Sequence, residues 1–285
     1  MNRKTFLQWT VLSAGLPLLG ASRAASDPLR IGLTAVILTD QAAFLSRWSE
    51  YLVRGLATPV TFVVRDSYQS ILDLLFANQL EAAWICGYPY TLHQRQLQLI
   101  AVPLYQGKPL YQSYLIKSSR PELEVRGWPD VRGKVMAYSD PLSNSGWLVA
   151  QTQLHAVGLS QRDLKKTFFA HGHRNVAEAV AAQLADVGPI DGYVWETMKA
   201  QRMPAVDQTE IVWKSEVFGF PPIVAPASAR NPRIQSLQAS LLEMHKDPDG
   251  RRLLDALNLT GFEAGSPSLF DSIARMSAAL QARTR

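Results

Sequence analysis

The feature of this sequence that most restricts its fold is the regular alternation of short apolar runs with stretches of helical spacing. In the first part of the chain, strand-like runs occupy Leu29–Leu33, Val60–Val64 and Ala82–Cys86. Between them, Asp40–Leu56 and Ser67–Ala77 carry apolar residues at the spacing of amphipathic helices, with Asp40 as a candidate N-cap. Such alternation predicts a mostly parallel sheet covered by helices.

The alternation continues and predicts a second α/β unit. The further expected strands are Leu99–Leu104, Gln112–Lys117, Lys134–Ala137, Lys166–Phe169, Gly192–Trp195 (a strand or strand end) and Thr209–Trp213. The further expected helices are Gly146–Val157, Asn175–Ala185, Arg233–Met244, Asp247–Leu257 and Ser268–Ala282. We expect the last helix to pack back on the first unit.

These elements predict two α/β lobes, with the second inserted into the first. Two strands that cross between the lobes, near Tyr111–Lys117 and Ile211–Phe218, would form the hinge. The expected division is 1–24 as a signal peptide, 25–112 plus 216–285 as the first lobe, and 113–215 as the second. Ligands of such folds bind in the crevice at the carboxyl ends of the strands, so an interlobe cleft is the expected site.

The N-terminus, Met1–Ser26, has the pattern of a cleavable export signal. Arg3 and Lys4 form a positive n-region, a short apolar stretch follows, and Ser22-Arg23-Ala24 places small residues at −3 and −1 of a cleavage site. The apolar stretch is too short to span a bilayer, although an uncleaved anchor is the alternative. The pattern predicts a periplasmic protein, exported by the Sec route or by a relaxed twin-arginine route.

Composition excludes several function classes. The net charge is +5, and after removal of residues 1–24 there remain 26 basic and 24 acidic residues without a dense basic run, which argues against nucleic-acid binding. The single cysteine, Cys86, rules out an internal disulfide and a multi-cysteine zinc site. No HExxH, Walker A or GxGxxG motif is present, so no cofactor is expected.

The most informative segment is Ser139–Trp147, which follows an expected strand and leads into an expected helix. Ser143, Asn144 and Ser145 stand at the helix N-terminus, where free N–H groups and the helix dipole favour an anion. Gly146 would let a ligand approach the backbone closely. An ordinary Ser/Asn helix cap is the alternative.

Two further segments carry polar residues at strand ends. His173 or Arg174 could donate to an anion, and a bound anion would draw the imidazole toward its cationic form; a solvated loop histidine is the alternative. Asp191 could accept from a protonated ligand oxygen or an amine, or it could cap the following helix.

Aromatic residues and the cysteine gather in the segment Trp84–Tyr90. Tyr88 and Tyr90 could bind a ligand through their hydroxyls or pack between the lobes. Cys86 is expected to be a small buried hydrophobe, and a role as a soft ligand for arsenite is the alternative.

Four segments together resemble the PhnD-like family of periplasmic binding proteins for phosphonate, phosphite and phosphate. Asp140–Gly146 is similar to the family's D-P-x-S-T-S-G signature, with Asn144 in place of Thr. Phe169–Glu196 is similar to its G-S-H and D-x-Y-V-W-E stretch, with Gly172 where Ser is common. Arg65–Tyr68 and Ala83–Tyr90 resemble its first-lobe pattern.

The resemblance implies a type II periplasmic-binding-protein fold, without catalysis, in a monomer that delivers a small oxyanion to an ABC permease. It implies a ligand site made of Ser143, Asn144, Ser145, Gly146 and His173, with Asp191, Tyr68 and Tyr90 as further contacts. Some relatives bind arsenite for a membrane histidine kinase, so a sensor subunit is an alternative.

A secreted hydrolase is the alternative of another class, because Ser143, His173 and Asp191 are the residue types of a catalytic triad. The serine does not lie in a G-x-S-x-G elbow, however, which argues against it.

Overall fold

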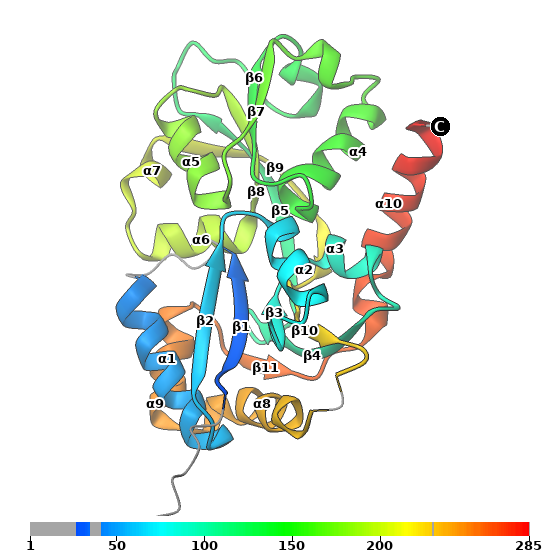
Figure 1. Ribbon diagram of the computed structural model, residues 1–285. Coiled ribbons are helices and arrows are strands. Elements are labelled where there is room, and N and C mark those ends of the chain that lie inside the picture. The colour runs from blue at the N-terminus through cyan, green and yellow to red at the C-terminus, as the bar shows by residue number, and fades with distance from the viewer. Residues whose placement is uncertain (1–26, 35–40, 230, 285) are drawn as a thin grey trace, which may run out of the picture.

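The computed structural model describes residues 27–34, 41–229 and 231–284. The predicted signal peptide and the predicted N-cap Asp40 lie outside these residues. Figure 1 shows two sheets, one above the other, each flanked by helices. We call the part built on the six-stranded sheet the first lobe and the part built on the five-stranded sheet the second lobe. The predicted two-lobe α/β architecture is confirmed.

The first lobe contains a sheet with the strand order β11-β4-β10-β3-β1-β2. Its strands are β1 (Leu29–Thr34), β2 (Val60–Arg65), β3 (Ala82–Trp84), β4 (Leu97–Leu104), β10 (Ile223–Pro226) and β11 (Gly261–Glu263). The helices that follow these strands are α1 (Gln41–Leu56), α2 (Tyr68–Phe76), α3 (Gly87–Leu92), α8 (Pro232–Leu242), η4 (Met244–Lys246) and α9 (Pro248–Ala256). Phe44, Trp48 and Leu52 recur at helical spacing on α1 and are buried, which fixes α1 against the sheet.

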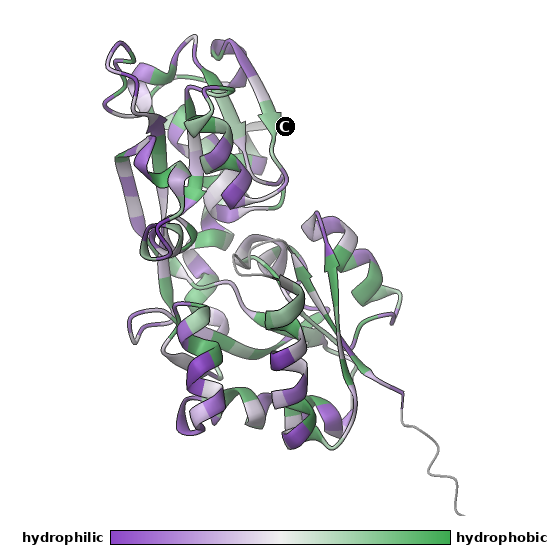
Figure 2. Ribbon diagram, turned by 90° about the vertical axis from the view of Figure 1, so that its left-hand side faces the viewer, coloured by the Kyte–Doolittle hydropathy of each residue, from purple (hydrophilic) through white to green (hydrophobic). Residues whose placement is uncertain are grey.

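The second lobe contains a sheet with the strand order β7-β6-β8-β5-β9. Its strands are β5 (Leu110–Ser118), β6 (Val135–Tyr138), β7 (Lys166–Phe169), β8 (Val187–Asp191) and β9 (Thr209–Gly219). Its helical segments are η1 (Trp128–Val131), η2 (Asn144–Leu148), α4 (Val149–Ala156), η3 (Gln161–Asp163), α5 (His173–Ala181), α6 (Gly192–Ala200) and α7 (Pro204–Asp207). Figure 2 shows the strands of both sheets as mainly hydrophobic and the helices as alternating between polar and apolar residues.

Both sheets are mixed, so the prediction of mostly parallel sheets is wrong. Strand β1 pairs in parallel with β2 and β3, and β6 pairs in parallel with β7 and β8. The strands that connect the lobes reverse this direction: β5 and β9 pair antiparallel with each other, and β10 returns antiparallel between β3 and β4. The chain that re-enters the first sheet through Gly219-Phe220-Pro221-Pro222 therefore runs against its neighbours.

The C-terminal segment touches both lobes. It consists of η5 (Pro267–Phe270) and α10 (Asp271–Thr284). Helix α10 contacts α3 of the first lobe and also η2 and α4 of the second, and Figure 1 shows it along the side of both. The prediction that this helix packs on the first lobe is therefore incomplete. Among the described residues, no helix combines the length and apolarity that a bilayer crossing needs.

Candidate ligand-binding site

The turn after β6 begins a helix earlier than the sequence predicts. Asn144–Leu148 forms one π-helical turn, and α4 continues it from Val149. Ser143 is the N-cap, and its Oγ accepts a hydrogen bond from the Gly146 N–H at 2.9 Å. Single π-turns within helices are rare and are frequently found at functional sites. The helix cap that was an alternative to an anion site is therefore present, and it occupies one of the N–H groups.

Buried polar atoms without partners mark this turn. Ser139 Oγ, Asn144 Oδ1 and Ser145 Oγ are buried and, in the part of the chain that the structure describes, make no hydrogen bond. Ser145 Oγ lies near the Tyr111 hydroxyl without reaching hydrogen-bond geometry. Leaving such a group unpaired costs about 1–3 kcal/mol, so three of them in one turn indicate a place where another molecule supplies the partners.

Gly146 has a packing reason in addition to its predicted role at the ligand site, which stays a prediction. A Cβ at this position would lie 1.9 Å from Ser139 Oγ and 3.0 Å from Cε1 of His173. The missing side chain therefore makes room for the Ser139 hydroxyl and the His173 ring, so close approach of a ligand is not needed to explain the glycine.

His173 is buried and neutral, which corrects the expectation of a partly charged imidazole. Its Nδ1 accepts the Asp191 N–H at 3.0 Å, so its proton belongs on Nε2, which lies 3.4 Å from Ser143 Oγ. Burial lowers the pKa of His173 to about 3. Gly172, the N-cap of α5, has φ 142°, a conformation that serine rarely adopts, and this explains the departure from the family's G-S-H. Arg174 instead pairs with Glu178 at the surface.

Asp191 serves as a helix cap and as part of a cavity wall at the same time. Its Oδ1 accepts the N–H groups of Tyr193 and Val194 at 2.8 and 3.4 Å, which starts α6 where the sequence suggested a strand. Burial raises its pKa to about 7. A carboxyl group with this pKa can hold a proton at neutral pH, and so it can accept or donate toward a ligand.

A narrow cavity lies between the lobes beside Asp191. It is lined by Leu33, Thr34, Tyr68, Trp84, Ile85, Asp191, Tyr193, Phe220 and Pro221. Its volume of about 10 Å³ is close to the room that one water molecule needs. The indole N–H of Trp84 is bound to the Pro221 carbonyl and the Tyr193 hydroxyl to the Leu257 carbonyl, so both rings present mainly apolar surface.

A second hollow continues from the first past Thr34 and Tyr68, which line both. Its other walls are Asp66, Ser139, Asp140, His171, Gly172 and His173. The Tyr68 N–H donates to Asp140 Oδ2 at 3.2 Å, which joins the first lobe to the second. Ser143, Asn144 and Ser145 are fully buried behind Ser139 and His173 and do not line either hollow.

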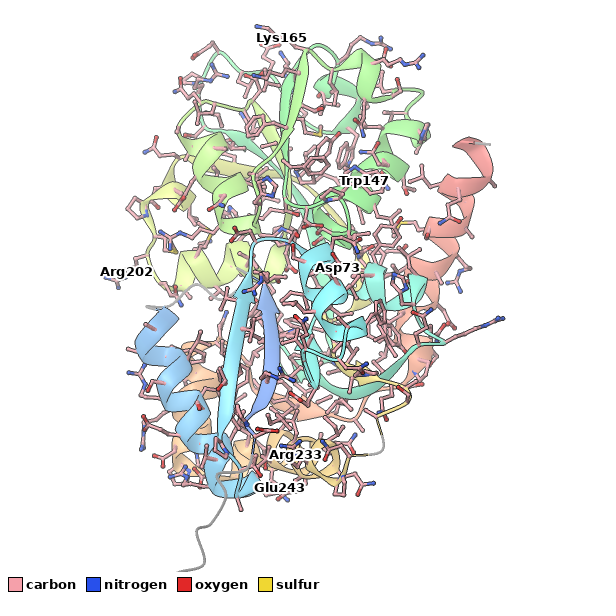
Figure 3. The ribbon with its side chains drawn as sticks, in the orientation of Figure 1. Asp73, Trp147, Lys165, Arg202, Arg233 and Glu243 are labelled. Atoms are coloured by element: carbon pink, nitrogen blue, oxygen red, sulfur yellow. The ribbon has the colours of Figure 1, made fainter. Side chains whose placement is uncertain are left out.

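Tyr90 and Cys86 lie apart from these walls. The Tyr90 ring packs edge-on against Phe270 at 4.8 Å. Tyr88 stacks on Trp147 of the second lobe, with ring centroids 6.2 Å apart; Trp147 is labelled in Figure 3. Cys86 is buried, its thiol pKa is raised to about 11 by burial, and the described residues contain no cluster of His, Cys, Asp or Glu that could hold a metal ion. Thr34, Trp84, Tyr193 and Phe220 also line the first cavity and were not among the predicted site residues, although Trp84 stands in the segment Trp84–Tyr90 that the sequence marks as rich in aromatic residues.

Among the described residues, no Lys or Arg lines either hollow, whereas Asp66, Asp140 and Asp191 do. Attraction for an anion would therefore come from helix ends and has to exceed the effect of these carboxyl groups. Four helical segments begin around the site, at Tyr68, Asn144, His173 and Gly192. Their N-termini are partly positive and favour an anion. Figure 3 shows the labelled cations Lys165 and Arg202 at the periphery of the molecule.

Comparison with known proteins identifies the family of this chain. Residues 39–270 match the family described as "ABC transporter, phosphonate, periplasmic substrate-binding protein". The phosphate-import protein PhnD of Mycolicibacterium smegmatis is 28% identical over 180 residues, which cover 59% of this chain. The matched region spans 56% of that relative's length.

Two solved structures share the fold over most of the chain. A binding protein component of an ABC phosphonate transporter from Pseudomonas aeruginosa has a TM-score of 0.80 at 17% identity, with coverage of 89% of this chain and 87% of its own. PhnD1 of Prochlorococcus marinus, in complex with methylphosphonate, has a TM-score of 0.78 at 17% identity, with coverage of 90% and 99%. The fold is therefore the type II periplasmic-binding-protein fold. The chain belongs to the family of periplasmic substrate-binding proteins of phosphonate ABC transporters.

Proposed function

We propose that this protein captures a small phosphorus oxyanion, a phosphonate, phosphite or phosphate, between its lobes and delivers it to an ABC permease. It would act in the periplasm, as a monomer, after cleavage of residues 1–24. The observation that carries the proposal is the pair of unpaired buried hydroxyls of Ser139 and Ser145 beside several helix N-termini. The unpaired Oδ1 of Asn144 would accept from a protonated ligand oxygen. The names of the relatives, which mention phosphate import and methylphosphonate, support the ligand class.

Recognition would rely on neutral donors. The Ser139 and Ser145 hydroxyls would donate to ligand oxygens. The Nε2–H of His173 would also donate, because its contact with Ser143 Oγ is long, at 3.4 Å. Neutral donors and helix dipoles neutralise an anion less strongly than a buried lysine would, which favours release as well as capture. Because the turn is fully buried and the cavity is small, the lobes would part to admit the ligand.

Asp191 would select the protonation state of the ligand. A carboxylate would repel a dianion, whereas it can accept from a P–OH group or an ammonium group. Its pKa of about 7 leaves it partly protonated at neutral pH, which lowers the repulsion. The site would therefore prefer a singly protonated oxyanion, or a ligand with an amine.

The geometry argues against hydrolysis. In a catalytic triad the base donates its Nδ1–H to the carboxylate. Here Nδ1 of His173 accepts from the Asp191 backbone N–H, and the Asp191 carboxylate caps α6. Ser143, His173 and Asp191 are neighbours, but the hydrogen bonds do not have the direction that activation of the serine needs.

A thermal-shift panel tests the proposal. The mature chain is heated with phosphate, phosphite, methylphosphonate, 2-aminoethylphosphonate, sulfate and arsenite, each at a large excess. A ligand that binds only the folded state adds about 2.7 kcal/mol at a hundredfold excess over Kd. We expect a rise in Tm with at least one phosphorus oxyanion, reduced by half or more in Ser145→Ala and kept in Ser46→Ala, an exposed serine on α1. No rise with any of them contradicts the proposal, and a rise with arsenite alone would favour a sensor.

A further inference from the structure

Three buried residues form a hydrogen-bonded chain between the lobes, behind the turn. The Asn144 N–H donates to Sγ of Cys86 at 3.2 Å, and the Asn144 side-chain amide donates to the Tyr111 hydroxyl at 3.0 Å. Exposed fractions are 1% for Cys86, 0% for Asn144 and 3% for Tyr111. The Tyr111 hydroxyl is also close enough to the Cys86 thiol to influence its pKa.

The three residues come from three elements that belong to the two lobes. Cys86 follows β3 and is the N-cap residue of α3 in the first lobe. Asn144 is the first residue of the π-turn in the second lobe. Tyr111 is near the start of β5, the first strand of the second lobe. It pairs with Phe218 near the end of β9, the last strand before the chain re-enters the first lobe.

Separation of the lobes would break this chain at one bond. Asn144 and Tyr111 belong to the second lobe, whereas Cys86 belongs to the first. Opening of the lobes would therefore separate Sγ from the Asn144 N–H and expose the thiol to water. Closure of the lobes would restore the hydrogen bond between Cys86 Sγ and the Asn144 N–H, and this bond would hold the backbone of the π-turn at Asn144. One N–H of the Asn144 side-chain amide is engaged by Tyr111, and Oδ1 accepts no hydrogen bond within the described residues.

We propose that Cys86, Asn144 and Tyr111 form a closure node in which a thiol from the first lobe positions the oxyanion-binding turn of the second. Asn144 and Tyr111 are then positioning residues, and Cys86 is a thiol whose reactivity reports the opening of the lobes. The node deepens the proposed function, because it requires that the lobes open and close. The rise of the Cys86 pKa to about 11 supports low reactivity in the closed form.

Labelling with N-ethylmaleimide tests the node, since Cys86 is the single cysteine of the chain. The thiolate adds to the maleimide double bond; an S–C bond forms, the C=C π bond breaks, and the adjacent carbon takes a proton from water. Both variants keep the Asn144 N–H that donates to Sγ but remove the amide–hydroxyl bond that holds this backbone in place. Without ligand, we expect slow labelling of the wild type and faster labelling, by at most about fivefold, in Asn144→Ala and in Tyr111→Phe, because one net hydrogen bond sets the upper limit. The double variant should gain less than the product of the two factors.

Controls separate the node from loss of structure. Tyr138→Phe removes another buried tyrosine hydroxyl in the second lobe, outside the node, and should label at the wild-type rate. Asn144→Thr introduces the family's residue, keeps the backbone N–H and removes the donor to Tyr111; it should label faster than wild type while its circular dichroism is unchanged. Wild-type rates in all node variants, or equal acceleration in Tyr138→Phe, overturn the node.

The same assay with phosphate, phosphite and methylphosphonate, each added separately, distinguishes the two proposals. If an anion slows labelling of the wild type, and the node variants label faster than the wild type in its absence, the proposed function and the node are both supported. If no anion slows labelling but the variants are still faster, the node stands and the proposed function fails. If an anion protects the thiol while the variants label at the wild-type rate, the proposed function stands and the node is wrong.

Discussion

The two lobes contribute different chemistry to the cleft. The first lobe supplies the apolar surface of Leu33, Trp84 and Ile85 on the cavity wall, together with Thr34, Tyr68 and one carboxyl group, Asp66. The second lobe supplies Ser139, His173 and Asp191, all buried polar groups at strand or helix ends. The difference indicates that the second lobe would carry most of the recognition of charge, while the first lobe would close over the ligand and exclude water. Substitutions in the two lobes should therefore have different consequences.

The largest expected effect is on stability in the first lobe. Trp84→Ala should lower the free energy of unfolding by about 3–5 kcal/mol, because it removes a large buried side chain on β3 and the partner of the Pro221 carbonyl. Urea denaturation measures this. Phe76→Ala, at an aromatic of the same lobe that is 37% exposed, should cost under about 1 kcal/mol. Equal losses in the two variants would mean that the wall is not part of the core.

The second expected effect separates two buried titratable groups of the second lobe. The folded-state pKa of Asp191 is raised to about 7, so its contribution to stability falls as pH rises from about 4 to 7. The folded-state pKa of His173 is lowered to about 3, so its contribution rises with pH between about 3 and 6.5. The two slopes oppose each other, and the wild-type stability should be nearly flat between about pH 4 and 6.5.

Single variants at the two positions would each show one of the two pH dependences of the free energy of unfolding. Asp191→Asn should give a stability that rises with pH over this window, and His173→Gln a stability that falls, each by at most about 1.4 kcal/mol per pH unit. Urea denaturation at pH 4, 5 and 6 measures both. The same pH dependence in both variants would contradict the assigned protonation states.

The third prediction concerns a variant that should lose ligand affinity without losing folding stability. Ser145→Ala should weaken the binding of a phosphorus oxyanion by about 10- to 100-fold, which is the loss of one hydrogen bond to a charged group. Its stability should not fall and should rise by up to about 1–3 kcal/mol, since the hydroxyl has no hydrogen-bond partner among the described residues and a buried unpaired group costs that much. Isothermal titration calorimetry and denaturation measure the two quantities. A stability loss without a loss of affinity would reverse the roles assigned to the lobes.

The smallest expected effect tests the departure at position 172. Gly172→Ser introduces the residue common in the family at φ 142° and should cost about 1–2 kcal/mol of stability. Gly158→Ser, at φ 70° and with open space around its Cα, is the control and should cost about 1 kcal/mol. A stabilising effect of Gly172→Ser would show that the loop adopts another conformation.

Local patterns in the sequence were sufficient for the elements with strong periodicity. The strands β1 and β2 and the helices α1 and α2 lie within a few residues of their expected positions. The segments with Ser143, His173 and Asp191 also lie side by side, because each follows a strand of one sheet and strand ends meet at one edge.

Features that depend on tertiary contacts could not be predicted. Strand β8 contains Gly188 and Pro189, which local propensity disfavours, yet it pairs with β5 at the centre of the sheet. The three-residue strand β11 is too short to be recognised from its sequence. The neutral state of His173 follows from burial by residues distant in the chain, and so does the packing of Tyr90 on Phe270. The lobe boundaries at 112/113 and 215/216 and the ligand contacts of the site residues remain predictions.

A crystal structure of the mature chain grown with methylphosphonate tests the central claim most directly. We predict one phosphonate group between the lobes, with its oxygens about 2.7–3.2 Å from Ser145 Oγ and from Nε2 of His173, and its methyl group toward Trp84. A phosphonate bound elsewhere, or a cleft in which Ser139, Asn144 and Ser145 remain without partners at saturating ligand, would contradict the claim.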